Sequence, residues 1–439
     1  MTDPSRFRAF KSALPLEYPS LFGHLEYTGW KDEQLSWKKT CYIGDWSFVA
    51  QIRVKGPDAV KLFSYLSINS FDNHPVGKAK HCVMCNEDGK VITEGVLLRH
   101  AEDDFEYEAS NVQWVLYHLK KGGYNAEATF PSTHKLQVSG PNSLALLEKL
   151  SKTTLRDVKF MNTKIIKIDG ADVIALRQGM AGEIGFELHG PIEQHQQVYN
   201  AVWEAGQEFG IRRLGRRTIQ INHLEACYPT TGVHYWNAAS DARMQDYFDF
   251  MDNNVPKEWA NSPFGSILKH NFPISFMGSW DGESIEELYR SPVEMGWSKS
   301  IKFDHEFIGR AALEEEVRHP KRKVVTLEFN SEDMIAIYAS HFGDGEVYQL
   351  LEMPHAPYIT NWTDWILRDG KKVGHATHPG YSFQFRKALA LSFVDIDSSE
   401  PGTPVSVLWG NPGDPQIEIR AKVAPAPYKQ DERRKDLTL

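Results

Sequence analysis

A short pattern occurs twice in the first third of the chain and constrains its fold more than any other feature. Residues 54–63 (VKGPDAVKLF) and 138–147 (VSGPNSLALL) each read as a strand, a Gly-Pro turn, an Asp or Asn cap and an amphipathic helix. Two related strand–helix units of this kind predict an α+β architecture. The match between the two units is too imperfect for a solenoid of repeats.

The last quarter of the chain has a different pattern. Short stretches of apolar residues alternate with turn signals such as Asp369-Gly370 and Pro401-Gly402, and they predict strands. The stretches are residues 324–329, 365–367, 373–377, 388–393, 405–409 and 417–422. Strands at this spacing predict a C-terminal antiparallel β-barrel of roughly 100 residues.

We therefore predict a chain of three parts. Residues 1–320 form a domain of two α+β subdomains. Within this domain, residues 236–292 are irregular and rich in aromatic residues and Asn, and they are interpreted as an insertion or a crossover. Residues 321–430 form the barrel domain. Residues 431–439 are a charged tail, and the chain is expected to fray from Lys429 to Leu439.

Composition excludes several classes of function. The chain has 439 residues, of which 41% are hydrophobic, and this is enough for two or three ordinary cores. A formal net charge of −9 argues against a nucleic-acid-binding surface. No apolar stretch is long enough to span a membrane, and the N-terminus has no apolar signal core. Four cysteines in so long a chain indicate a reducing cytoplasm, and the oligomeric state stays open.

A glycine-rich run is the first candidate binding feature. Residues 179–188 (GMAGEIGFEL) place three glycines around two carboxylates, directly after a strand-like stretch at 173–176. Glycines let the backbone turn tightly and approach a ligand closely. A carboxylate just past such a turn can accept two N–H bonds from a flat heterocycle, and a pterin offers that edge.

Seven stretches, in a fixed order along the chain, resemble those of a known protein family. They are residues 44–47 (GDWS), 54–59 (VKGPDA), 120–125 (KKGGYN), 179–182 (GMAG), 302–310 (KFDHEFIGR), 380–382 (GYS) and 423–428 (VAPAPY). From about residue 30 to residue 428, the chain resembles the folate-dependent methyltransferases built on the aminomethyltransferase, or glycine-cleavage T-protein, fold. It is most similar to the tetrahydrofolate-dependent O-demethylases of vanillate and related methoxyarenes.

The resemblance implies a folate-binding fold of three subdomains and a specific reaction. A methyl group moves from a small-molecule donor, an aryl methyl ether, to N5 of tetrahydrofolate, giving 5-methyltetrahydrofolate. The family's pterin-binding glutamate maps onto Glu187, and an aromatic residue that lines the folate pocket maps onto Tyr228. Arg217 lies where aminomethyltransferases place an Arg near the active site. The surrounding arginines at 212–217 could also attract the glutamate tail of folate.

Three positions depart from the pattern of the methoxyarene demethylases. Ile219 replaces their catalytic Tyr, and Trp46 lies where they have a Gln-Ser-His-His run. Glu108 replaces an Arg that grips the substrate carboxylate, which reverses the charge at a recognition site. We therefore expect carboxylated donors such as vanillate and syringate to be poor substrates. If Glu108 and Trp46 both face the substrate, a cationic donor would also fit, through charge pairing and cation–π contact.

Ether cleavage needs a proton or a hydrogen-bond donor at the leaving oxygen. Because Ile219 cannot supply one, three other residues are candidate catalytic residues. By the resemblance, Glu94 lies at the place of the acidic residue of the aminomethyltransferases, while His223 precedes and Tyr235 follows the turn at Tyr228. No metal site is predicted, since the lone pair Cys82 and Cys85 has no second pair of ligands.

Other functions on the same fold remain open at this stage. One is demethylation of a sulfonium or N-methyl cation, whose leaving group departs neutral and needs no strong acid. Another is a lipoyl-carrier-dependent aminomethyltransferase, although its Asn is replaced by Glu108. A third is a folate-binding assembly or repair protein, whose Cys-containing motif is not found here.

Overall fold

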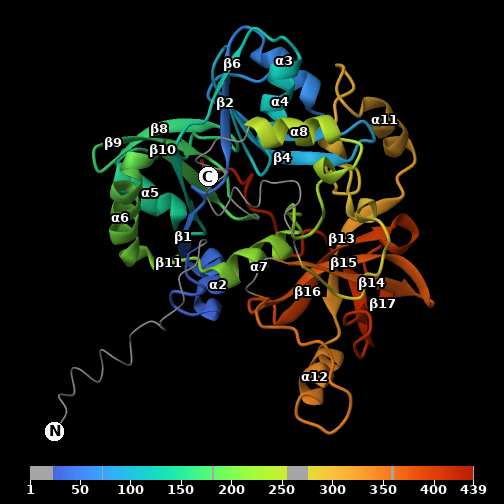
Figure 1. The fold of residues 1–439 in the computed structure, drawn as a ribbon. Coiled ribbons are helices and arrows are strands. Elements are labelled where there is room, and N and C mark those ends of the chain that lie inside the picture. Colours follow the sequence, from blue (N-terminus) through green and yellow to red (C-terminus); the bar gives the residue numbers. More distant parts are fainter. Residues whose placement is uncertain (1–22, 72, 180–181, 255–274, 357–359, 439) are drawn as a thin grey trace, which may run out of the picture.

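The computed structural model describes residues 23–71, 73–179, 182–254, 275–356 and 360–438. Three β-sheets, each with its own hydrophobic core, dominate the fold (Figure 1). None of the helices within the described residues combines the length and hydropathy needed to cross a lipid bilayer.

The first sheet has the strand order β11-β1-β7-β10-β9-β8 and is antiparallel except at the β1–β11 pair. Helices α5 and α6 pack against each other and cover the sheet (Figure 1). The elements are β1 (Cys41–Asp45), β7 (Thr133–Ser139), α5 (Ser143–Ser151), β8 (Thr163–Ile168), β9 (Ala171–Leu176), β10 (Gly185–Pro191), α6 (His195–Gly206) and β11 (Ile211–Arg213).

The second sheet is antiparallel throughout, with the order β3-β4-β5-β2-β6. Its core includes aromatic residues of three helices, among them Phe63, Trp114 and Tyr247. The elements are β2 (Gln51–Lys55), α3 (Ala59–Leu66), β3 (Ala79–Cys85), β4 (Val91–Ala101), β5 (Asp104–Ala109), α4 (Gln113–Lys121), β6 (Glu127–Thr129) and α8 (Gln245–Asn254).

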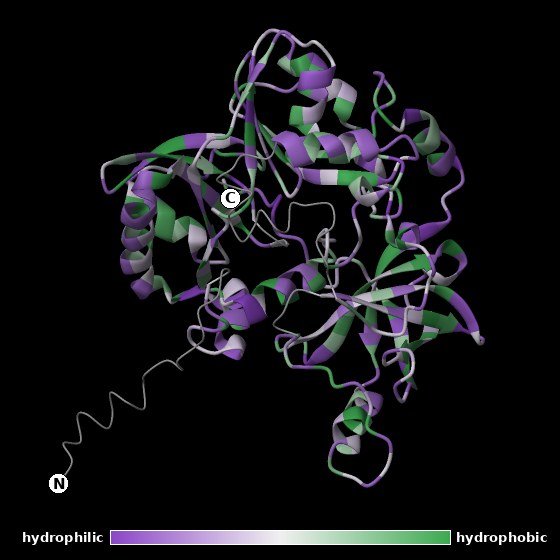
Figure 2. Cartoon of the chain, in the orientation of Figure 1, coloured by the Kyte–Doolittle hydropathy of each residue, from purple (hydrophilic) through white to green (hydrophobic). Residues whose placement is uncertain are grey.

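The third sheet confirms the predicted C-terminal barrel. Pairing of β14 with β17 closes the six strands β13 to β18, and each neighbouring pair among them is antiparallel. Burial alternates along β17 and β18, as expected where one face meets the core, and Figure 2 shows hydrophobic and hydrophilic residues mixed along the barrel. The elements are α11 (Arg310–Arg318), β13 (Arg322–Phe329), α12 (Ser331–Ser340), β14 (Asn361–Arg368), β15 (Lys371–Ser382), β16 (Lys387–Asp395), β17 (Pro404–Trp409) and β18 (Ile417–Ala424), with β12 (Phe276–Met277) parallel to β14.

Helix α7 (Arg216–Ala226) lies between the barrel and helix α2 (Trp30–Lys39) and connects them (Figure 1). Its Glu225 is fully buried and accepts hydrogen bonds from Trp37 Nε1 at 3.0 Å and from Ser382 Oγ at 2.6 Å. Gly380 lets α7 approach the barrel, since a Cβ atom there would lie 2.6 Å from Ile221 Cδ1. One buried carboxylate thus joins a helix from the start of the chain to a barrel strand.

The two strand–turn–helix units expected from the repeated pattern are present as β2–α3 and β7–α5. Their glycines are required for two reasons. Gly56 and Gly140 have φ of 145° and 117°, and a Cβ atom on either would lie within 2.9 Å of backbone from another segment. Asp58 and Asn142 occupy the cap positions without capping the helices. Their side chains instead bond Asn125 N and Phe209 O, so they tie neighbouring loops to the turns.

Residues 236–292, expected to be irregular, contain helix α8, whose Tyr247, Phe248 and Met251 are buried against the second sheet. Apolar residues spaced one and three apart on a polar segment are a weak helical signal in sequence. Residues 255–274 of this segment, and Met180 and Ala181 of the glycine-rich run, lie outside the described residues.

The expectation that the charged tail frays is wrong for residues 431–438. Just before them, Lys429 is only 4% exposed, and its Nζ lies 2.6 Å from Asn222 Oδ1, 3.4 Å from Glu183 and 3.8 Å from Glu225. Farther on, Leu437 is 6% exposed and packs into the core of the first sheet. The tail docks because a buried ammonium group faces two carboxylates at its start and an apolar side chain anchors its end.

Lys429→Ala tests this anchor. The substitution leaves Glu183 and Glu225 buried without their cation, so we expect a loss of stability of about 3 kcal/mol. Thermal unfolding measures the loss, and trypsin should cut the loosened tail faster after Arg433 and Arg434. Lys422→Ala is the matched control, because Lys422 pairs with Glu328 at the surface and should contribute less than about 1 kcal/mol. Equal unfolding temperatures for the two variants would contradict the anchor.

Candidate functional site

A large cavity opens where the three parts of the fold meet. Its volume is about 1610 Å³, and its walls come from β3, β4 and β5, from β7 and β10, from α7 and from the docked tail. This exceeds the roughly 300–1,000 Å³ usual for one small-molecule site, so two ligands can occupy it together. Seven of the residues singled out from the sequence line it: Trp46, Glu94, Glu108, Glu187, Ile219, His223 and Tyr228.

Two of the residues singled out from the sequence do not line the cavity. Tyr235 is 1% exposed, and its hydroxyl has no hydrogen-bond partner among the described residues. Arg217 forms ion pairs with Glu26 at 3.5 Å and Glu352 at 3.7 Å. Their expected roles at the site therefore find no support in the geometry.

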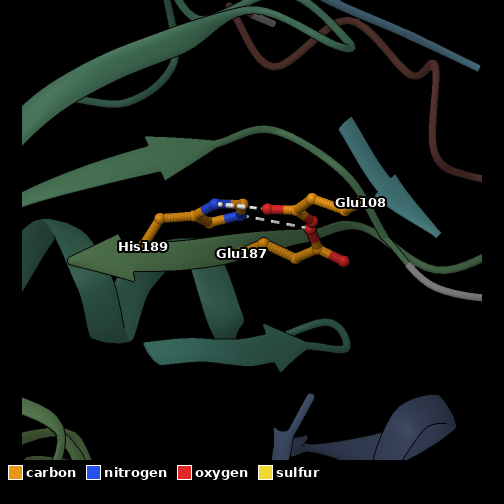
Figure 3. A group of neighbouring side chains, drawn as sticks. All are labelled: Glu108, Glu187 and His189. Atoms are coloured by element: carbon orange, nitrogen blue, oxygen red, sulfur yellow. Dashed lines mark hydrogen bonds and ion pairs between the residues drawn. The ribbon is translucent and has the colours of Figure 1, made fainter. Parts of the chain in front are cut away.

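A buried cluster of charges forms one end of the cavity. His189 on β10 lies between two carboxylates, with Nδ1 3.2 Å from Glu108 Oε1 and Nε2 3.3 Å from Glu187 Oε2 (Figure 3). Lys135 on β7 adds a second cation 3.6 Å from Glu108. The two carboxylates and two cations balance, so Glu108 does not present an unopposed negative charge.

The protonation of His189 follows from these contacts. Burial alone would lower its pKa, but the ion pairs with Glu108 and Glu187 raise the pKa of His189 to about 10. Burial likewise opposes ionisation of Glu108, while Lys135 and His189 lower the pKa of that carboxyl. Donor atoms of Glu108, Glu187 and His189 lie within 4.8 Å of one another, close enough for a metal ion. A protonated imidazole has no lone pair for a metal, so an ion-pair cluster describes the group better.

The glycine-rich turn positions Glu187. Gln178 at its start donates from Nε2 to Glu187 Oε1 at 3.0 Å. Gly179 must be glycine, because a Cβ atom there would lie 1.4 Å from the carbonyl oxygen of Glu183. Each oxygen of Glu187 holds one bond and keeps further lone pairs for N–H donors of a ligand. Across the same sheet, Gln137 Oε1 accepts a bond from Trp46 Nε1 at 3.1 Å and so fixes that ring.

A second polar group lies on the wall formed by β3 and β4. Glu94 Oε2 is 2.7 Å from His81 Nε2 and accepts a bond from the Tyr228 hydroxyl at 3.0 Å. The ring of Trp297 packs edge-on against His81, with centroids 4.8 Å apart. His81 was not identified from the sequence, where a single His in an apolar strand was its only signal. Burial and the charge of Glu94 raise the pKa of Tyr228 well above its usual value, so its hydroxyl stays protonated.

His223 on α7 is held next to this group. Its Nδ1 lies 2.9 Å from Thr230 Oγ1. Burial lowers the pKa of His223 to about 4, so the ring is neutral near pH 7 and is a poor proton donor there.

His189→Gln tests the charge cluster through its pH dependence. A raised folded-state pKa means that the contribution of His189 to stability is complete below about pH 6.5, its unfolded value. The contribution falls as pH rises and is lost above about pH 10. We therefore expect the difference in unfolding temperature between wild type and His189→Gln to be several degrees at pH 6.5 and to shrink toward pH 10. His195→Gln, which removes an exposed ion pair with Asp45, is the control. A difference that grows with pH would rule out a protonated His189.

Comparison with known proteins finds relatives over nearly the whole chain. The family described as GCVT N-terminal domain matches residues 7–244, and the glycine cleavage T-protein C-terminal barrel domain matches residues 350–428. A syringate O-demethylase from Sphingobium sp. is 34% identical, over 94% of this chain and 91% of the relative. A sesamin methylene transferase from Sinomonas sp. is 32% identical, over 93% of this chain and 90% of the relative.

More distant relatives show the same fold. An aminomethyltransferase from Thermotoga sp. is 24% identical, over 97% of this chain and 93% of the relative. The crystal structure of glycine cleavage system aminomethyltransferase T from Bartonella henselae aligns with a TM-score of 0.65 at 18% identity, covering 92% of this chain and 90% of that one. The expected α+β fold with a C-terminal barrel is thus confirmed, and the chain belongs to the aminomethyltransferase, or glycine-cleavage T-protein, family.

Proposed function

We propose that this protein is a tetrahydrofolate-dependent O-demethylase that moves a methyl group from an aryl methyl ether to N5 of tetrahydrofolate. The observation that carries the proposal is one cavity that holds both the Glu187 cluster and the Glu94 group. The names of the relatives, a syringate O-demethylase and a sesamin methylene transferase, support transfer of a one-carbon group from an aromatic donor.

The folate would bind at the Glu187 end of the cavity. Glu187 is 7% exposed, and both its oxygens can accept further N–H bonds from the pterin edge. The rings of Tyr228 and Trp297, with centroids 6.1 Å apart, provide flat apolar surface on the cavity wall. When bound, tetrahydrofolate supplies the amine nitrogen that takes the methyl group and releases one proton.

The chain must supply a proton to the leaving oxygen, because a phenolate is a poor leaving group in a low-dielectric site. The pair His81 and Glu94 suits this role, since an imidazolium is in general a stronger acid than a phenol, and the Glu94 carboxylate 2.7 Å from His81 Nε2 would hold it in place. Tyr228 keeps its proton and donates it in a hydrogen bond to Glu94, so we assign it a positioning role. In this proposal, the pair His81 and Glu94 takes over the role of the catalytic Tyr that Ile219 replaces in this chain.

The balance of charges near Glu108 restricts the charge of the methyl donor that the cavity can bind. Because His189 and Lys135 compensate Glu108, the cavity has no free anion there to attract a sulfonium or an N-methyl cation. The same position lacks the Arg that would hold a carboxylate. We therefore propose a neutral methoxyarene as the donor, selected by shape and hydrogen bonds.

The function is tested by incubating the protein with tetrahydrofolate and a panel of donors, and detecting 5-methyltetrahydrofolate by mass. We expect product from a neutral methoxyarene, less from vanillate, and little from a cationic donor. Glu187→Ala should weaken folate binding by about 2–4 kcal/mol, the scale for removing one partner of a buried charge-assisted bond. Glu193→Ala, an exposed carboxylate outside the cavity, is the control. Absence of product with every donor would refute the proposal.

Proton transfer is tested by single-turnover rates with folate bound. Glu94→Gln should slow the methyl transfer by about 10²–10⁴, the usual contribution of a general acid. His81→Gln should slow it to a similar degree, and Tyr228→Phe less, because it removes only the bond that orients Glu94. Tyr235→Phe is matched to Tyr228→Phe, since it deletes a hydroxyl that does not line the cavity. Wild-type rates in both Glu94→Gln and His81→Gln would exclude this pair as the acid.

A further inference from the structure

Methyl transfer to N5 moves two protons. The leaving oxygen receives one from the pair His81 and Glu94, whereas N5 loses one as it becomes a tertiary amine. If N5 kept its proton while the new bond formed, a positive charge would build up on it, which is costly in a partly buried site. The site therefore needs a proton acceptor close to N5 as well as a donor close to the oxygen.

Most titratable groups that line the cavity cannot accept this proton. Lysine and arginine side chains are already protonated and have no lone pair, and Tyr228 keeps its proton. Each of the three lining glutamates lies within 3.3 Å of a ring nitrogen of His81 or His189. Within the described part of the chain, two histidines line the cavity. Because His81 serves the leaving oxygen, the neutral ring of His223 is the base that remains.

The contacts of His223 leave one of its ring nitrogens free. Nδ1 lies 2.9 Å from Thr230 Oγ1 and 3.4 Å from the carbonyl oxygen of Tyr228. A carbonyl oxygen can only accept, so these contacts fit a proton on Nδ1 and a lone pair on Nε2. Nε2 has no hydrogen-bond partner within the described residues, and it is not enclosed by protein. Since His223 lines the cavity, this lone pair is open to a ligand there.

His223 lies close to the proton donor. The rings of His223 and Tyr228 have centroids 5.9 Å apart, and the Tyr228 hydroxyl donates to Glu94 at 3.0 Å. In a reactive complex the nucleophile lies only about 3–3.5 Å from the carbon that it attacks. A donor and an acceptor on opposite sides of the methyl group are thus separated by roughly the width of one ring, which is the separation that Tyr228 provides.

Helix α7 also brings His223 toward the Glu187 end of the cavity. Burial raises the pKa of Tyr42, and of its neighbours Glu187 raises it and Asn222 lowers it, so both lie close to the Tyr42 hydroxyl. This hydroxyl donates to Gln137 Oε1 at 3.1 Å, and Gln137 is paired with Glu187 across β7 and β10. Asn222 directly precedes His223. The imidazole therefore lies between the expected pterin site and the donor pair.

A weak base is sufficient at this place. The lone pair of N5 is delocalised into the adjoining ring, so N5 is weakly basic and its protonated form is a strong acid. Burial lowers the pKa of His223 to about 4, while Glu94 on β4 raises it and Lys429 in the tail lowers it. Proton transfer is efficient where donor and acceptor have similar pKa values.

We propose that His223 is the catalytic base that takes the proton from N5. The N5–C bond forms with the nitrogen lone pair, and the C–O bond breaks with its electrons going to oxygen. The His81 imidazolium protonates that oxygen, and His223 Nε2 binds the proton that leaves N5. His223 then releases one proton to solvent and His81 takes one up, so the overall reaction consumes none. The inference rests on the proposed function, because it assumes the pterin at Glu187.

Single-turnover rates with tetrahydrofolate and a neutral methoxyarene test this base. His223→Gln and His223→Ala should each slow methyl transfer by about 10²-fold or more, the scale of general base catalysis. Added imidazole should restore part of the rate of His223→Ala in proportion to its concentration, because it can enter the space left by the side chain. The control His195→Ala removes a histidine outside the cavity, and it should keep the wild-type rate and not respond to imidazole.

A series of aryl methyl ethers separates the base from the acid. As the released phenol becomes more acidic, Glu94→Gln should approach the wild-type rate, because a better leaving group needs less help from a proton donor. His223→Gln should keep its deficit through the series, since the nitrogen nucleophile stays the same. A deficit of His223→Gln that vanishes with the better leaving groups would place His223 at the oxygen and overturn the proposal.

The other outcomes separate the base from the function on which it rests. Wild-type rates in His223→Gln, or a deficit in His223→Ala that imidazole leaves unchanged, would overturn the role of His223 and leave the demethylase proposal standing. Calorimetry should show that both variants bind tetrahydrofolate as tightly as wild type. Loss of that binding would assign His223 to the fold or the folate site and would also exclude it as the base. Absence of product from wild type with every donor would overturn both proposals.

Discussion

The imidazolium of His189 between Glu108 and Glu187 is the interaction on which the site depends. Glu108 belongs to β5 of the second sheet, whereas His189 and Glu187 belong to β10 of the first. Buried charges are costly unless they are paired. The cluster is therefore stable only while the two sheets keep the relative position that brings Glu108 next to His189. It therefore ties the two sheets together at one end of the cavity and helps to orient the Glu187 carboxylate.

Local features of the fold could be read from the sequence, because their signals are local. Short apolar stretches separated by turn residues predict the six barrel strands. The two repeated units are each marked by a glycine whose Cβ position another segment approaches within 3 Å. The docking of the tail could not be predicted from sequence. Residues 431–437 are mostly charged, and such a run at a terminus is typical of a disordered segment. Lys429 is buried only because Glu183 and Glu225, from a loop and from α7, come together beneath it.

The residues of the candidate site fall into the same two groups, those with a local signal in the sequence and those without one. Glu187 and Glu94 follow from the glycine-rich turn and from the resemblance to a family, which carry positional information. His81 and His189 have no motif around them, and the structure singles them out through partners from distant parts of the chain; His81 and Tyr228, for example, are 147 residues apart. Burial decides the rest, because a neutral His223 and an enclosed Tyr235 differ from their surface counterparts only through desolvation.

The docked tail also has a consequence for how the protein folds. The hydrogen bond from Arg156 to the carbonyl oxygen of Leu437 joins residues 281 positions apart. Such a contact requires closure of a very long loop, so we expect it to form late in folding. The outer wall of the cavity should then be the last part to assemble and the first to open. A chain whose three sheets are already folded would still lack a finished site until this segment has docked.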